Sequence, residues 1–413
     1  MLSKNHRDLL VMAAKNGYFP DNCFCPGQCK FCYERDFTKV FPGIRTQCIP
    51  VYTKEAFDFF CKKLFDYRKI NKEKIDLKIR GNCLQKTKDG FQYFPACDFF
   101  NLGLTQSQIE KVVQIQNEFY TTGLNADFKL IKALSEKYPN KFRLHLSIIT
   151  FDPSIRRNIM NPDINMDNLK KICKVAIRPV YFLVYFNKKQ IASDIGILNK
   201  FSQKNKGSFY IHKLYYNKFS PDCIKDYATK GEDNFKSIIY YLKFNDKKLG
   251  NISKRLYFAP SSKIYAWKSQ NDIEQLLKVC KGSDSEAIFC SIGAYQLIRS
   301  LRKKMHVIAI ENSMGGCVDF TIGITVKSII HKISEMSADG IVLRYIYIPK
   351  SMFVFKDKFD LNGDTVGLIK EEFPGIKIKV IDIPLRVHAS LSLDTCFRYY
   401  ILEESNRLNI FQG

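Results

Sequence analysis

Segments that read as strands alternate with segments that read as helices through most of the sequence. In the first half, short apolar stretches are separated by stretches whose apolar residues recur at helical spacing. We expect strands there at residues 75–79, 119–124, 142–151, 177–186 and 208–215. Such alternation predicts parallel strands joined by right-handed crossover helices. The predicted fold class is therefore α/β, with a first part that closes partly or wholly into a barrel.

A second alternating set follows in the C-terminal part of the chain. Its strands are expected at residues 255–258, 287–292, 307–311, 340–348 and 376–383. Between the two sets, residues 217–253 are charged and show little rhythm beyond one helix, so we interpret them as a connector. A chain of 413 residues is long enough for two hydrophobic cores. We predict a barrel domain over residues 1–216 and a smaller α/β domain over residues 254–413.

A loop near the start of the chain carries Cys25, Cys29 and Cys32 around a Pro-Gly turn. Thiolates are the usual ligands of iron–sulfur clusters, and a tight loop can hold three irons of a 4Fe–4S cube while leaving the fourth open. The alternative is a tetrahedral zinc site, with Cys23 as a fourth thiolate. The remaining cysteines are scattered, as buried reduced thiols usually are, and show no disulfide framework.

Together with the aromatic Phe31, these three cysteines resemble the cluster motif of the radical SAM superfamily. The resemblance covers about residues 15–216 and implies a partial (β/α)6 barrel of TIM-barrel type, with a 4Fe–4S cluster on Cys25, Cys29 and Cys32. It also implies that S-adenosyl-L-methionine chelates the open iron, with Phe31 near its adenine. An electron from a donor such as flavodoxin or ferredoxin would then release a 5′-deoxyadenosyl radical, which abstracts hydrogen from the substrate.

Ligands of such barrels lie at the carboxyl ends of the strands, where the loops converge. By this rule, the residues expected around S-adenosyl-L-methionine include Gly81, Asn82, Ser147 and Asn187, and the resemblance adds Arg156. Many radical SAM proteins hold the methionine amino group with a Gly-Gly-Glu-like turn, and this chain has no plain copy. Gly81 and Asn82, or residues 98–101, are candidates for that place. Ser147 and Arg156 resemble polar residues that bind the carboxylate or ribose, although a structural role is the alternative for each.

The C-terminal half carries two turns, at residues 290–294 and 310–316, that lead from an apolar strand through small residues into a helix. They predict either a ligand pocket or simple tight turns. Next to the second turn, Cys317 is a candidate hydrogen donor or substrate carrier, or else a buried thiol. The element order over about residues 284–383 is similar to an uncharacterised module fused behind radical SAM barrels in bacteria. Members commonly begin with a PDZ-like domain, for which residues 1–17 are too short.

The chain has 65 Lys and Arg against 41 Asp and Glu, a formal charge of +24 that would attract polyanions. The alternative is that the lysines are spread over solvated helix faces. No apolar run is long enough for a membrane span, and residues 1–15 lack a signal-peptide pattern, so we expect a cytoplasmic protein without a membrane partner.

The expected function is that of a radical SAM enzyme acting on an unidentified substrate, with RNA and peptide as the two candidate classes. Residues that act on the substrate are not assigned by the sequence. The alternative is a zinc-binding, nucleic-acid-binding protein without radical chemistry.

Overall fold

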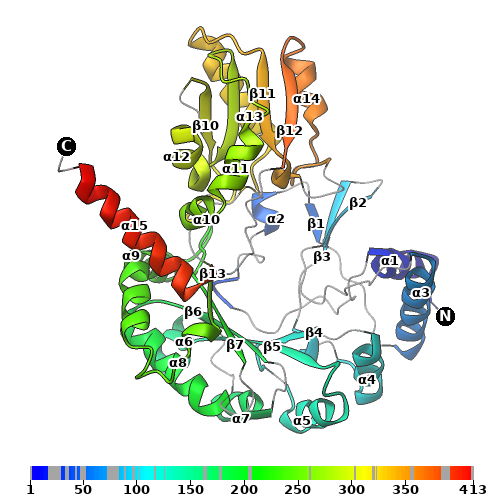
Figure 1. Cartoon of the computed structure of the whole chain (residues 1–413). Coiled ribbons are helices and arrows are strands. Elements are labelled where there is room, and N and C mark those ends of the chain that lie inside the picture. Colours follow the sequence, from blue (N-terminus) through cyan, green and yellow to red (C-terminus); the bar gives the residue numbers. More distant parts are fainter. Residues whose placement is uncertain are drawn as a thin grey trace.

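A computed structural model shows the fold of the chain (Figure 1). It describes residues 2–16, 29–32, 37–41, 44–46, 53–71, 83–87, 90–94, 98–101, 103–115, 118–124, 126–160, 165–175, 179–202, 207–259, 262–301, 304–318, 321, 323–353, 358–382 and 391–410. Within these residues the strands form three sheets, with six, four and three strands. The predicted strand at residues 75–79 lies outside the described part of the chain. The predicted α/β fold class is confirmed.

The six-stranded sheet forms the lower half of the molecule in Figure 1. Its strands, in spatial order, are β13 (Leu391–Ser392), β8 (Leu256–Ala259), β7 (Ser208–His212), β6 (Val180–Val184), β5 (Arg143–Ile149) and β4 (Glu118–Thr121). All neighbours are parallel except β13, which pairs antiparallel with β8. Because β4 to β8 follow in chain order, right-handed crossovers place their helices on one face.

Those helices form an arc along the outer side of the sheet (Figure 1). They are α4 (Gln106–Ile115), α5 (Phe128–Lys137), α6 (Pro153–Ile159), α7 (Met166–Val175), α8 (Lys188–Ser202) and α9 (Asp222–Phe244). The strand residues that face them, such as Phe119, Leu144 and Tyr181, are fully buried. Alternation then points the other strand residues to the inner face.

The inner face of this sheet carries a row of stacked rings from neighbouring strands. Tyr120 stacks on His145 with ring centroids 4.2 Å apart, and His145 stacks on Phe182 at 5.8 Å. The row continues through Tyr210, which stacks on Tyr257 at 5.4 Å. Cross-strand aromatic pairs each stabilise a sheet by roughly 0.2–1 kcal/mol. The row therefore joins five strands on the face opposite the arc of helices.

Residues 217–253, predicted to be a connector, form the long helix α9 and join the first α/β unit. Ile224, Phe235 and Ile239 of α9 are buried in the same core as the six-stranded sheet. These apolar residues recur at helical spacing among many lysines, which hid the pattern in the sequence. The strand predicted at 255–258 is β8, and it pairs with β7 rather than with the second sheet. The first unit thus extends to about residue 259.

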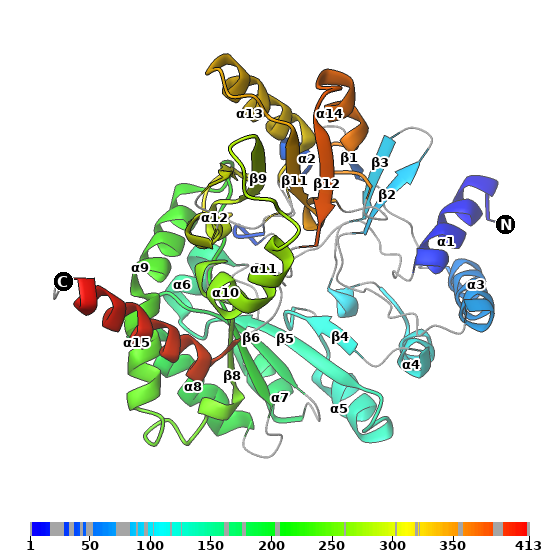
Figure 2. The same ribbon diagram turned by 45° about the horizontal axis from the view of Figure 1, so that its top comes forward.

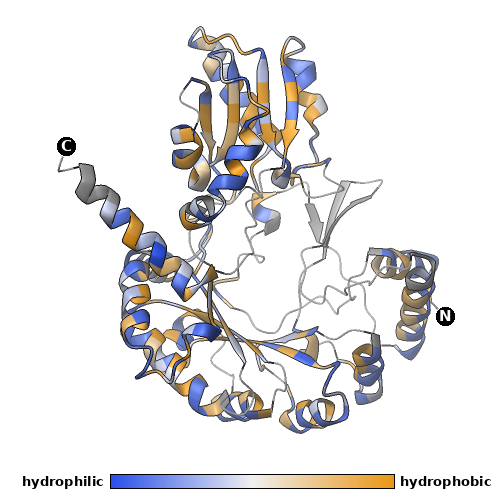
Figure 3. Ribbon diagram, viewed as in Figure 1, coloured by the Kyte–Doolittle hydropathy of each residue, from blue (hydrophilic) through white to orange (hydrophobic). Residues whose placement is uncertain are grey.

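The four-stranded sheet stands above the first (Figures 1 and 2). Its strands, in spatial order, are β10 (His306–Ile310), β9 (Glu286–Ser291), β11 (Tyr345–Pro349) and β12 (Lys377–Ile381). They are parallel, and β9 lies inside the sheet although it comes first in sequence. The chain therefore winds outward in both directions, and its helices cover both faces. Strands of both sheets carry hydrophobic residues (Figure 3).

The helices of the second unit divide between two cores. One core lies under α10 (Ser262–Lys268), α11 (Gln270–Leu277) and α12 (Ile292–Leu301), and the other under α13 (Val326–Ala338) and α14 (Val366–Glu372). The last helix, α15 (Leu393–Ile410), returns to the first unit, where Phe397 contacts Tyr240 of α9 with ring centroids 5.1 Å apart. The chain thus crosses between the two units more than once.

The remaining elements lie near the N-terminus or are single turns. They are α1 (Lys4–Asn16), α2 (Phe37–Val40), β1 (Ile44–Thr46), α3 (Lys54–Asn71), β2 (Cys83–Thr87), β3 (Gly90–Phe94) and the 3-10 turns η2 (Phe99–Asn101), η3 (Ser253–Arg255) and η4 (Lys350–Met352). The small sheet has the order β1-β3-β2. In the part of the chain that the structure describes, no helix combines the length and apolar character needed to cross a bilayer.

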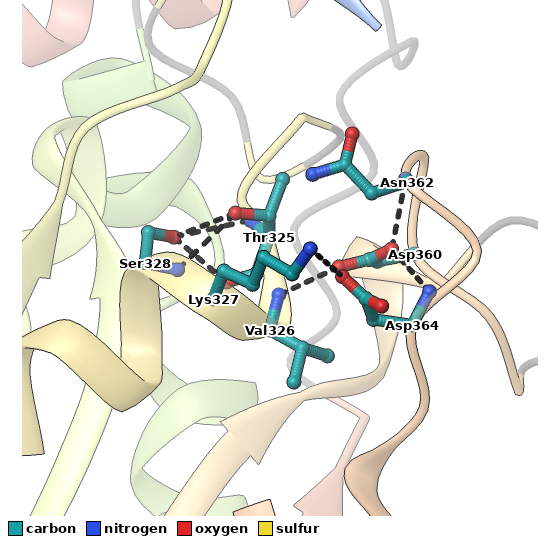
Figure 4. A network of polar contacts seen from close by, with 7 residues as sticks. All are labelled: Thr325, Val326, Lys327, Ser328, Asp360, Asn362 and Asp364. Atoms are coloured by element: carbon teal, nitrogen blue, oxygen red, sulfur yellow. Dashed lines mark hydrogen bonds and ion pairs between the residues drawn. The ribbon is translucent and has the colours of Figure 1, made fainter. Parts of the chain in front are cut away.

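A buried carboxylate fixes the carboxyl edge of the second sheet (Figure 4). Asp360, which is fully buried after β11, accepts hydrogen bonds from the backbone N–H of Val326 at 2.6 Å, Asn362 at 2.8 Å and Asp364 at 2.9 Å. Burial raises the pKa of Asp360, and these N–H donors oppose the shift. Thr325 adds a capping box at the start of α13. The first N–H groups of α13 are thus satisfied by the chain itself.

Candidate functional site

A strained turn ends β5 at the carboxyl edge of the first sheet. Ile149 has φ 67°, and the N–H of Thr150 donates to the carbonyl of Ile148 at 2.8 Å, which closes a γ-turn. The pairing of β5 with β6 shifts register between Ser147 and Ile149. A β-branched residue in this region of backbone space is costly and persists only where its surroundings hold it. Such strain is often found at functional sites.

Helix α6 begins directly after this turn and positions Arg156. Asp152 caps the helix by accepting from the N–H of Ser154 at 2.8 Å and of Ile155 at 3.1 Å. Pro153 occupies the first turn, where its missing N–H costs nothing. The sharp start places Arg156 one turn into α6, with its side chain directed back toward β5.

Arg156 holds the strained turn through two hydrogen bonds to its backbone carbonyls. Its side chain is only 4% exposed, and Nη1 donates to the carbonyls of Ile148 and Thr150, the residues on either side of Ile149. Its buried Nη2 has no hydrogen-bond acceptor among the described residues. Burial lowers the pKa of Arg156, and the negative charges of Cys29 and Asp194 oppose that shift. The guanidinium therefore lies within electrostatic reach of a cysteine of the predicted cluster loop.

A second buried network joins the ends of β5 and β6. Asp194, 1% exposed, accepts from the N–H of Phe151 at 2.8 Å and from the side chain of Gln190. Gln190 also donates to the hydroxyl of Thr150 at 3.2 Å. Desolvation raises the pKa of Asp194 to about 6, although its hydrogen bonds oppose the shift. Asn187, a predicted cofactor residue, accepts from the N–H of Gln190 at 2.8 Å and so caps α8.

The described part of the cysteine loop lies against α6. The N–H of Lys30 donates to the carbonyl of Ile159 at the end of α6, at 3.2 Å. A turn closes within the loop, where the N–H of Cys32 donates to the carbonyl of Cys29 at 3.2 Å. Cys29 and Phe31 pack against the core of the first unit, and both cysteines are half-buried. Two thiols thus share one tight turn near the carboxyl edge of a parallel sheet.

Asp98 closes the neighbouring edge at the end of β4. It is 7% exposed and accepts from the hydroxyls of Thr121 at 2.9 Å and Thr122 at 2.8 Å, and from the N–H of Thr122 at 2.6 Å. Burial raises the pKa of Asp98, and the Thr122 and Thr121 donors oppose the shift. Residues 98–101 were a candidate for holding the methionine group. In the structure, the carboxylate of Asp98 is held by donors from its own chain.

The structure brings several of the predicted site residues to one region. Ser147 lies near the end of β5 in register with Phe182, and so on the inner face of the sheet. Arg156 lies on α6, and the turn of residues 29–32 lies against the end of that helix. Asn187 follows the end of β6. Three predicted residues lie outside the described part of the chain: Cys25, Gly81 and Asn82.

Three residues of this region were not predicted from the sequence. Gln190 and Asp194 are four residues apart on α8, a spacing that usually marks a solvated helix face. Nothing in the apolar stretch around Ile149 signals a left-handed turn. A polar pair that follows the carboxyl end of a predicted strand was the only available hint.

The carboxyl edges of the two large sheets meet at one contact. The N–H of Cys317 donates to the carbonyl of Tyr216 at 3.2 Å, and the N–H of Lys218 donates to the carbonyl of Met314 at 3.0 Å. Tyr216 follows β7 and Met314 follows β10, so loops from the ligand-binding ends of both sheets lie against each other. The Cys317 thiol also accepts from the N–H of Tyr216 at 3.2 Å. Cys317 is thus part of the contact between the two units.

Among the residues that the structure describes, no three His, Cys, Asp or Glu side chains lie close enough to hold a metal ion. Two of the three predicted cluster ligands, Cys29 and Cys32, belong to the described residues, whereas Cys25 and the alternative zinc ligand Cys23 do not. A scan against models of protein families finds no match to this chain, and a search among curated proteins finds none either.

Proposed function

We propose that the chain is a radical SAM enzyme that abstracts a hydrogen atom from its substrate. The observation that carries the proposal is the turn of Cys29 and Cys32, held against α6 at the carboxyl edge of a parallel sheet. This is the edge at which α/β proteins bind ligands. Two thiols on one turn, with a third motif cysteine four residues earlier in sequence, suit an iron–sulfur cluster better than isolated thiols do.

The winding of the first unit supports a partial (β/α)6 barrel. Strands β4 to β8 follow in chain order, and their helices lie on the outer side only (Figure 1). In the described part of the chain, the inner face carries a row of stacked rings and no helix layer. A sheet wound in one direction curves toward its uncovered face, as barrel sheets do.

The residues present fit the proposed cofactors. Cys25, Cys29 and Cys32 would hold a 4Fe–4S cluster. Near them, the buried Nη2 of Arg156 has no acceptor among the described residues, so it could donate a hydrogen bond to a ligand. When bound and reduced, the cluster supplies the electron that cleaves S-adenosyl-L-methionine and so provides the hydrogen-abstracting radical. Phe31 packs beside Cys29 on the core, where an apolar ring can cover a ligand. Ser147 lies at the same edge, where its side chain is buried.

The chain's own part in the reaction is to position the ligands and to exclude water. Arg156 and Asp194 both hold the turn after β5 through buried hydrogen bonds to Thr150 and Phe151. The loop of Met314 to Cys317 lies over the loop that follows β7. Contact between the two carboxyl edges would limit the access of solvent to the region where a reactive radical would form. The +24 charge favours RNA as the substrate class, and peptide is the competing proposal.

Anaerobic reconstitution with iron and sulfide tests the cluster ligands. We expect a brown protein whose broad visible absorbance bleaches on addition of dithionite. Cys29→Ala should lose most of the bound iron, because one of three ligands is gone. Cys223→Ala is the matched control, since Cys223 is also half-buried but lies on α9 outside the motif. A colourless wild-type protein that retains stoichiometric zinc would support the zinc-binding alternative instead.

A further inference from the structure

Among the residues that the structure describes, the Nη2 group of Arg156 is a buried donor without an acceptor. Arg156 is only 4% exposed. Its Nη1 group donates both of its hydrogen bonds, to the carbonyls of Ile148 and Thr150. Leaving a buried charged donor unsatisfied costs more free energy than leaving a neutral one unsatisfied. Native proteins rarely accept that cost without a ligand or a functional reason.

Two acidic side chains interact electrostatically with Arg156, those of Cys29 and Asp194. The turn that carries Cys29 also lies against the helix of Arg156, because the N–H of Lys30 donates to the carbonyl of Ile159 at 3.2 Å. Asp194 is already engaged, because it accepts from the N–H of Phe151 and from Gln190. No hydrogen bond joins Asp194 to Arg156 among the described residues. This inference rests on the proposed function, which assigns an iron–sulfur cluster to Cys29.

We propose that Arg156 is a positioning residue that provides the counter-charge for the iron–sulfur cluster on Cys29. One-electron reduction makes a cluster more negative by one charge, with no bond made or broken. A fixed positive charge nearby favours the more negative form, and buried charges are weakly screened. Net charge and hydrogen bonds to sulfur are known determinants of cluster potential. Arg156 therefore raises the midpoint potential and makes the cluster easier to reduce.

The test is an EPR-monitored redox titration of the reconstituted full chain, with dithionite as reductant and without S-adenosyl-L-methionine. Omitting that ligand separates an effect on the cluster from an effect on ligand binding. Arg156→Gln removes the charge, and Arg156→Met is a second neutral variant that fills the buried space. Arg156→Lys keeps the charge. Arg157→Gln is the matched control, because Arg157 is the exposed neighbour on the same helix.

We expect a lower midpoint potential for both neutral variants, with Arg156→Lys close to wild type and Arg157→Gln unchanged. Melting temperatures of the cluster-free proteins show whether each variant is folded. A purely structural role of Arg156 would lower the melting temperatures, but the midpoint potentials of Arg156→Lys and of the two neutral variants would not differ. Wild-type potentials in the neutral variants would overturn this inference and leave the proposed function standing. A wild-type protein that binds no cluster would overturn both.

Discussion

Ile149 adopts a backbone conformation that a β-branched side chain rarely tolerates, and its neighbours hold it there. Arg156 binds the carbonyls on both sides of it, and Gln190 and Asp194 fix Thr150 and Phe151 just beyond. The strained residue, the unsatisfied guanidinium and the cysteine turn therefore belong to one region at the end of β5. Strain and unpaired buried donors cluster where a protein binds or reacts, and that is why we place the site here.

The buried Asp194 predicts a pH dependence of stability. Its pKa is raised from 3.8 to about 6 in the folded chain, so between these values the folded protein holds the proton more tightly than the unfolded chain does. This group's contribution to stability is therefore complete below about pH 4 and is lost as the pH rises through about 6.

Asp194→Asn removes this dependence, because a neutral amide resembles the protonated acid. Relative to the variant, the free energy of unfolding of the wild type should fall by roughly 2–3 kcal/mol from pH 4 to pH 7. Urea unfolding at several pH values measures the difference. Asp226→Asn, at an exposed position of α9, controls for the loss of one acidic group. Parallel curves for the wild type and Asp194→Asn would show that the carboxyl is not buried as described.

At the scale of elements, the sequence pattern located strands well and their grouping less well. The strands β4 to β7 and β9 to β12 lie within a few residues of their predicted positions, because each is an apolar run between turn signals. Helix α9 was missed as a core element because charged residues, among them Lys225, Lys230 and Lys236, interrupt its apolar residues. Strand β8 was predicted but assigned to the wrong sheet, since pairing between distant segments leaves no local signal.

The loop at residues 310–316 was predicted to be either a ligand pocket or a tight turn. In the structure it forms the contact between the two units. Gly316 has φ 67°, and a Cβ there would lie 2.4 Å from the carbonyl oxygen of Tyr216. A side chain is therefore excluded by backbone conformation and by space together.

Gly316→Ala should destabilise this contact, and Gly282→Ala separates the two causes. Gly282 has φ 78° as well, but a Cβ there meets nothing within 4 Å. We expect about 1 kcal/mol for Gly282→Ala from backbone strain alone, and at least twice that for Gly316→Ala. Thermal unfolding measures both, and limited proteolysis reports whether the contact has opened. Equal losses in the two variants would mean that the contact with Tyr216 contributes nothing.

At the scale of the whole molecule, two parallel sheets are arranged so that their ligand-binding edges meet. The first winds in one direction and leaves a ringed inner face uncovered, whereas the second winds in both directions. The alternation of strands and helices in the sequence predicted both units but not how they are oriented toward each other. That orientation depends on a contact between the loops after β7 and β10. A covered edge with a cysteine turn beside it is the arrangement expected of an enzyme that must shield a radical.

The most direct test of this account is the formation of 5′-deoxyadenosine. The reconstituted full chain is incubated anaerobically with S-adenosyl-L-methionine and dithionite, and the products are separated by liquid chromatography and identified by mass. We expect 5′-deoxyadenosine from the wild type and from Cys223→Ala, and none above background from Cys29→Ala. A cluster-loaded, reduced wild-type protein that yields no 5′-deoxyadenosine, or a Cys29→Ala variant that yields as much as wild type, would contradict it.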